Sequence, residues 1–207
     1  IPTTTPEEKA EVIGNKADEI LTKIPPSATP AQEKKNLNQL KLLGESLEVV
    51  TNESSQSVKE KTNAANTILT AAEQSVTNVG DDDVVSTALA TVTVVSNKVA
   101  YVDQSARDTL FDVIDTTSKR NGGFTEEMTG LAIETLNNIT NSVTGDQNLS
   151  QSDANLKQVE ASLDKVFDAA VTSTNSQPSD ISITTEAIQA RFVRNSISSM
   201  EGTVLRV

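Results

Sequence analysis

The sequence contains no cysteine and no histidine among its 207 residues. These two absences exclude disulfide bonds, thiol catalysis, histidine-dependent triads and zinc sites built from thiolate or imidazole ligands. Tryptophan is also absent, and aromatic residues make up only 2 % of the chain. A hydrophobic core must therefore be built mainly from Val, Leu, Ile and Ala.

Long apolar runs and an excess of positive charge are missing as well. No segment approaches the ~20 consecutive apolar residues that cross a bilayer. The net charge is −12, which disfavours nucleic acid and anionic lipid as partners because both are bound through clustered Lys and Arg. Solubility explains this acidity, and a surface for divalent cations is the alternative.

Signals for the start of a helix recur along the chain. Thr5 and Thr29 each precede a proline, and each is followed three residues later by Glu8 or Gln32, which is the pattern of a capping box. Ser57, with Glu60 three residues later, predicts a third box. Asp81, Asp82 and Asp83 stand where a helix N-terminus would favour carboxylates. The other predicted N-caps are Asp103 or Ser105, Thr125, and Ser150 or Ser152.

Between these signals the apolar residues are spaced by three and four positions, as on one face of a helix. The clearest stripe is Leu156, Val159, Leu163, Val166, Phe167 and Ala170. We therefore predict a mostly α fold, an antiparallel bundle or stack of about seven helices with short connections. The predicted helices are 6–23, 30–51, 57–78, 82–97, 104–119, 126–143 and 152–173.

After Asp180 the spacing of apolar residues changes to that of strands. Ile181 and Ile183, then Ile188 and Phe192, and finally the segment 204–207 indicate short strands at the start of a β-subdomain. So few strands are marginally stable alone, and the first residue is Ile rather than Met. We therefore expect the chain to be a piece of a longer protein.

Two linkers rich in Pro, Ser and Thr lie between the predicted elements, at 24–28 and 172–180. We use them as boundaries. They predict three parts: an N-terminal helix and linker that stands apart (1–28), a helical bundle (29–174) and the incomplete β-subdomain (175–207).

The order of motifs carries a resemblance to a known family. Leu43-Gly44-Glu45-Ser46-Leu47 is followed by a polar helix, then by a segment 88–97 that ends in Val-Ser-Asn, a short link and the helix that begins at Asp103. From about Leu43 to Val207 this order resembles the helical region between the REJ and GAIN modules of polycystin-1-like proteins, and the helical subdomain A of GAIN domains generally. The bundle 29–174 would then be similar to that subdomain.

The resemblance implies the ectodomain of a large membrane protein, on a cilium or elsewhere on the cell surface, with a role in adhesion, mechanical linkage or assembly. Many GAIN domains cleave themselves at a His-Leu-Ser/Thr site in the sheet subdomain. This chain has no histidine, so no cleavage residue can be transferred to it.

Three Asn-X-Ser/Thr sequons are candidate glycosylation sites, at Asn52, Asn138 and Asn148. Asn52 and Asn148 fall in predicted loops and are the first candidates. Asn138 falls in a predicted helix, where only an outward face would admit a sugar. If sugar is attached at these sites, the protein passes through the secretory pathway.

The acidic residues offer weaker candidate sites. Asp81, Asp82 and Asp83 together suggest either a Ca²⁺ site or favourable charges at a helix N-terminus, and the second interpretation is the simpler one. The segment from Asp146 begins like a calcium loop but has Gln151 and Lys157 where glycine and glutamate are required. We therefore predict no metal, cofactor or catalytic residue.

These observations favour a non-catalytic extracellular module of a polycystin-like cell-surface or ciliary membrane protein. Its expected partners are other proteins or neighbouring modules of the same chain, and the sequence does not identify the residues that bind them. The alternative is a helical assembly protein of an intracellular or bacterial structure, without glycans, that associates with itself through an apolar helix face.

Overall fold

The structure is a computed structural model of the chain, and it describes residues 4–25, 27–50, 54–97, 103–143, 149–173, 180–185 and 188–193. Over these residues it contains seven helices followed by a two-stranded hairpin, which confirms the predicted mostly α fold. The elements are α1 (Pro6–Thr22), α2 (Pro30–Glu48), α3 (Ser55–Gln74), α4 (Asp82–Ser96), α5 (Gln104–Ser118), α6 (Glu126–Val143), α7 (Leu149–Thr172), β1 (Asp180–Thr184) and β2 (Gln189–Val193).

Local capping explains where most of the helices begin. The capping boxes at Thr5 and Thr29 both form, with the threonine oxygen and the N3 side chain each accepting from the other residue's backbone amide. Asp81 and Asp103 cap α4 and α5 with their carboxylates. Thr125 Oγ1 accepts from Met128 N at 3.2 Å at the start of α6. These predicted caps are confirmed.

Two predicted caps are wrong. Ser54 rather than Ser57 caps α3: Ser54 Oγ accepts from Ser57 N, and Ser57 Oγ accepts from Ser54 N, both at 3.0 Å. The box therefore consists of two serines, and the helix begins at Ser55. The last helix begins at Leu149, ahead of both Ser150 and Ser152, so neither of these can be its N-cap.

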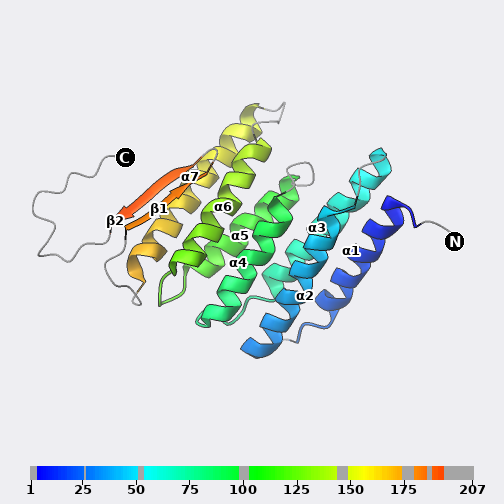
Figure 1. Cartoon of the computed structure of the whole chain (residues 1–207), viewed down its shortest axis with the longest axis horizontal. Coiled ribbons are helices and arrows are strands. Elements are labelled where there is room, and N and C mark those ends of the chain that lie inside the picture. The colour runs from blue at the N-terminus through cyan, green and yellow to red at the C-terminus, as the bar shows by residue number, and fades with distance from the viewer. Residues whose placement is uncertain are drawn as a thin grey trace, which may run out of the picture.

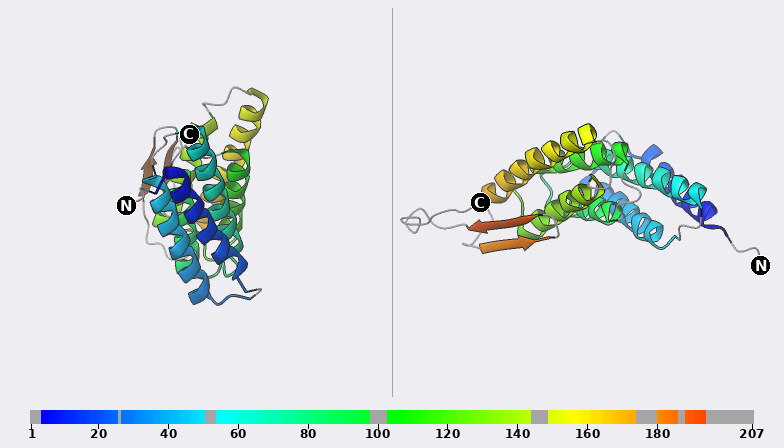
Figure 2. Two further views of the ribbon diagram at one scale, coloured as in Figure 1. Left: turned by 90° about the vertical axis from the view of Figure 1, so that its right-hand side faces the viewer. Right: turned by 90° about the horizontal axis from the view of Figure 1, so that it is seen from above.

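The helices form two layers. In one layer α1, α3, α5 and α7 lie side by side in that order, and in the other α2, α4 and α6 do (Figure 1). Successive helices alternate between the layers and run in opposite directions. Seen from above, the stack bends into an arch whose inner side is formed by α2, α4 and α6 (Figure 2).

The hairpin continues the inner layer beyond α6. Strands β1 and β2 pair antiparallel with Asp180 opposite Val193 and Thr184 opposite Gln189, and β1 contacts α6. The strands predicted around Ile181 and Phe192 are confirmed. Ile188 instead precedes β2, where it is buried. The predicted strand at 204–207 lies outside the described residues.

The first helix belongs to the same hydrophobic core as the others, so the prediction that it stands apart is wrong. Ala10 and Ala17 are fully buried. A Cβ added to Gly14 would lie 3.4 Å from the Cα of Ala64 on α3. Small residues one helical turn apart therefore let α1 approach α3 closely.

Buried threonines complete the core between α4 and α6. Thr93 Oγ1 and Thr135 Oγ1 lie 2.8 Å apart. Each hydroxyl also lies within hydrogen-bond distance of the carbonyl oxygen four residues earlier in its own helix, that of Leu89 at 2.7 Å and that of Leu131 at 2.9 Å. Because every hydroxyl has a partner, threonine occupies core positions without the cost of an unsatisfied polar group.

The link between α5 and α6 requires glycine at position 123. Gly123 has a φ of 66°, and a Cβ added to it would lie 2.2 Å from Ser173 N and 2.4 Å from Ala169 O. The next residue is tied to the same helix end, because Phe124 N donates to Ala169 O at 2.8 Å. No local motif in the sequence indicates this contact with the end of α7.

Gly123→Ala should lower the free energy of unfolding by about 3 kcal/mol, because the substitution combines an unfavourable backbone conformation with a clash against main-chain atoms. Gly130→Ala is the matched control: it lies within α6 with nothing within 4 Å of the added Cβ, and it should raise stability by about 0.5–1 kcal/mol. Chemical denaturation measures both. Equal effects would contradict the tight link.

Candidate functional site

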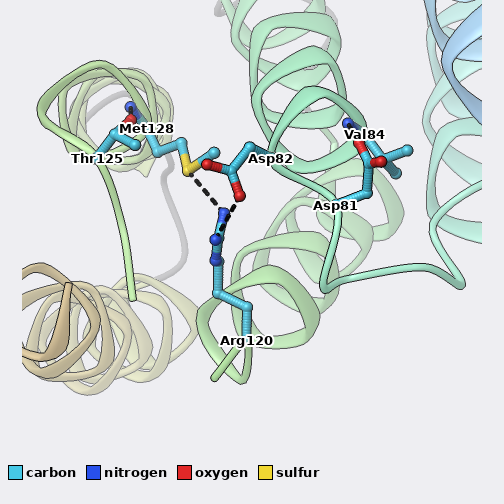
Figure 3. Close-up of polar contacts among 6 residues, drawn as sticks. All are labelled: Asp81, Asp82, Val84, Arg120, Thr125 and Met128. Carbon is cyan, nitrogen blue, oxygen red and sulfur yellow. Dashed lines mark hydrogen bonds and ion pairs between the residues drawn. The ribbon is translucent and has the colours of Figure 1, made fainter. Parts of the chain in front are cut away.

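The three aspartates at the start of α4 have three different partners. Asp81 Oδ1 accepts from Val84 N at 3.0 Å, and Asp82 Oδ1 accepts from Arg120 Nη2 at 2.6 Å (Figure 3). Asp83 forms an ion pair with Lys34. Their carboxylates do not converge on one point. Among the described residues, no group of three acidic side chains is arranged to hold a metal ion. The geometry therefore supports the helix-start interpretation.

Arg120 joins three helices at this end of the stack. It follows α5, its side chain is only 6 % exposed, and it pairs with Asp82 at the start of α4. Its Nη1 lies 3.5 Å from the sulfur of Met128 in the first turn of α6 (Figure 3). Asp82 is the acid that balances this buried guanidinium, so the contact is a structural clamp.

The sequons fall in different environments. Asn52 and Asn148 lie outside the described residues. Asn138 is 8 % exposed, and its Nδ2 donates to Ser96 Oγ of α4 at 3.1 Å. The outward face that a sugar on Asn138 requires is therefore absent. The physical reason is that α6 packs against both α4 and α7, so that it is buried on more than one side.

One pair of carboxylates interacts across the outer layer and was not identified from the sequence. Burial, followed by the charge of Asp112 on α5, raises the pKa of the Glu73 carboxyl on α3. Neither residue lines the hollows that lie between α1 and α2. No spacing rule links residues on two helices before the packing is known, so the sequence carried no signal for this pair.

A groove between α1 and α2 is the best candidate for binding. It consists of two adjoining hollows of about 590 Å³ and 470 Å³, which share Lys16 and Leu43 in their linings. Three aliphatic side chains of these linings are unusually exposed: Val12 by 49 %, Leu42 by 60 % and Val49 by 80 %. The hollows are open to solvent and combine these aliphatic side chains with polar ones, so they suit the side chains of a partner surface better than an enclosed small ligand.

Lysines form the rim of this α1–α2 groove. Lys9 and Lys16 on α1 and Lys23, directly after its last residue, are spaced seven residues apart, and Lys35 lies on α2. All four are exposed. Lys23 Nζ lies 3.7 Å from a Glu19 carboxylate oxygen. A positively charged rim around an apolar floor is notable on a chain whose net charge is −12.

The sequence contained part of the signal for this groove. The seven-residue spacing of the lysines indicates that they share one side of a helix. It does not say whether that side is covered. The structure settles this point, because Ala10 and Ala17 face α3 and thereby turn the lysine side away from it.

Comparisons with known proteins supply no relative. No family model matches the sequence, and no curated protein and no solved structure was found to be similar to it. Within the described residues, no helix has both the length and the apolar character needed to cross a bilayer.

Asp82→Asn should destabilise the fold by about 2 kcal/mol, because it leaves the buried Arg120 without an anionic partner. Asp83→Asn is the control: Asp83 and its partner Lys34 have side chains 69 % and 43 % exposed, and the loss of such a surface pair costs about 0–1 kcal/mol. Urea denaturation of the two variants measures the difference. Equal losses would show that Arg120 is not a clamp.

Proposed function

We propose that this chain is a non-catalytic structural module that holds neighbouring modules or partner proteins at a fixed spacing, as part of an extracellular, polycystin-like cell-surface or ciliary protein. The observation that carries the proposal is the continuous stack, with α1 at one end of the long axis and the hairpin at the other (Figure 1). Elements attached at these two ends are held apart by the full length of the stack.

Buried polar contacts between neighbouring links support the rigidity that a spacer needs. Glu33 in the first turn of α2 is fully buried. Its carboxylate accepts from Thr77 N and Asn78 N, both at 3.1 Å, and from the Thr77 hydroxyl. Asn78 Nδ2 donates in turn to Ala28 O at 2.9 Å. The α1–α2 link is thereby joined to the α3–α4 link.

Two buried cations extend this bracing along the stack. Lys61 of α3 donates to Val50 O, just beyond the end of α2. Arg107 of α5 donates to Ser142 Oγ at 3.0 Å and to Ser142 O at 3.2 Å, in the last turn of α6. Together with Arg120 these contacts tie the ends of helices to their neighbours, which opposes hinge motion between them.

The extracellular part of the proposal rests on the resemblance to polycystin-1-like regions and on the loop sequons at Asn52 and Asn148. The fold is compatible with that resemblance, since helices precede the strands. The lysine-rimmed α1–α2 groove is the surface at which we place a protein contact.

Single-molecule energy transfer tests the spacer directly. Because the chain has no cysteine, Glu11→Cys on α1 and Thr184→Cys on β1, both at exposed positions, give two specific labels. We expect one narrow distribution of transfer efficiency below the unfolding transition. The control is a second pair of labels, Ala154→Cys with Asp168→Cys, at two exposed positions of the single helix α7. It gives the width of the transfer-efficiency distribution that a rigid element produces. A broad or double distribution for the labels at positions 11 and 184 would overturn the proposal of a rigid spacer.

Glycopeptide mass spectrometry on protein from its native source tests the location. We expect sugar on Asn52, Asn148 or both, and none on Asn138, because that side chain is buried against Ser96. Unmodified peptides at all three sequons would favour the intracellular or bacterial alternative. That result would leave the spacer geometry untouched.

A further inference from the structure

The α1–α2 groove opens at one end of the stack. On α1, the side formed by Ala10, Gly14 and Ala17 packs on α3. Lys16 and Lys23 lie roughly opposite that side on the helical wheel. The groove therefore faces away from α3, at the open end of the stack.

Helix α7 forms the other end of the outer layer. Lys165 of α7 pairs with Asp115 of α5, and Asn155 exchanges hydrogen bonds with Gln104 of α5. Leu156 and Val171 lie on the other side of α7, where they are 37 % and 68 % exposed. This side of the helix faces away from α5, just as the groove faces away from α3.

The outward side of α7 is both apolar and acidic. Leu156, Leu163 and Phe167 follow each other at steps of seven and four, and the last two are partly buried against the core. The acids Asp153, Glu160 and Asp164 occupy the same side and are exposed. We call this side, from Asp153 to Val171, the α7 edge. It is an amphipathic surface whose charge is opposite to that of the groove rim.

We propose that copies of this chain associate end to end, with the α7 edge of one copy seated in the α1–α2 groove of the next. Aliphatic side chains of the edge would cover Leu42 and Val12, while Glu160 and Asp164 would lie near Lys16 and Lys23. Complementary charges of this kind orient two partners and increase their association rate.

The relative direction of the helices is consistent with this arrangement. Both α1 and α7 belong to the outer layer, and every second helix runs in the same direction (Figure 1). End-to-end association would thus place α7 of one copy beside α1 of the next copy, with the two helices running in the same direction. Helices α5 and α7 lie beside each other in this way within one chain. The two contacting surfaces differ, so the interface is heterologous and leaves a free end at each side of a growing chain.

Association of the copies goes beyond the proposed spacer function. The energy-transfer experiment reports the rigidity of one copy at single-molecule dilution, whereas association is measured at high protein concentration. Failure of either proposal is therefore distinguishable from failure of the other.

Sedimentation velocity on the purified chain is the first test. The weight-average mass should rise with protein concentration, and the rise should weaken in high salt because the charged rim is exposed and screened. A monomer at every concentration in low salt would overturn the proposal.

Two single variants identify the surfaces. Leu42→Asp changes an exposed groove residue and Val171→Asp an exposed residue of the α7 edge, so each variant alone should remain monomeric while keeping its helical circular dichroism. Mixed together they should form a 1:1 dimer through the intact α7 edge of the first and the intact groove of the second. A mixture that stays monomeric, or a single variant that still associates, would contradict an end-to-end interface.

Charge variants keep the test valid if an aspartate disturbs folding. Lys16→Glu should weaken association roughly tenfold, and adding a copy that carries Glu160→Lys should restore part of it. Lys59→Glu makes the same charge change at an exposed position of α3 and should leave association unchanged. Equal weakening by Lys16→Glu and Lys59→Glu would show that only net charge matters and would overturn the proposed contact.

Discussion

The shortage of large side chains is the constraint on which the rest of this structure depends. With aromatic residues at 2 %, the helices must approach closely to leave no empty space between them. A Cβ on Gly44 of α2 would lie 3.0 Å from a methyl group of Val95 on α4. At such short separations Thr91 of α4 can donate to Leu37 O of α2 at 3.1 Å while fully buried. Close approach thus makes threonine a suitable core residue.

The buried charges follow the polarity of the helices they contact. Glu33 lies in the first turn of α2, where a negative charge is favoured, whereas Lys61 and Arg107 bind carbonyl groups at or just beyond the C-terminal ends of α2 and α6. Lys61 and Arg107 thereby satisfy carbonyl groups at or next to a helix C-terminus, whereas Glu33 accepts from two backbone amides of the α3–α4 link. The same contacts that compensate for burial therefore hold adjacent layers together, and the stack gains its order from polar as well as apolar contacts.

The helices were predictable because their signals are local, whereas the placement of surfaces was not. A threonine before proline, as at Thr5 and Thr29, determines a helix start from a few neighbouring atoms. At the start of α3 two serines compete, and the hydrogen bond from Ser54 to Glu7 of α1 favours the earlier one. That contact, the burial of Asn138 and the open side of the α1–α2 groove all depend on which helices become neighbours. Apolar spacing along the chain carries no information on that choice.

The alternation of helices between two layers has a mechanical consequence. A pulling force applied along the stack acts across the helix axes, because the helices lie side by side along its length (Figure 1). Under such a load a terminal helix can peel away while the contacts behind it stay intact, since each helix contacts mainly its near neighbours. Peeled helices extend into chain many times longer than their width in the stack. A module of this kind keeps its length at rest and lengthens in small successive steps under tension, so that it dissipates work instead of breaking at one threshold.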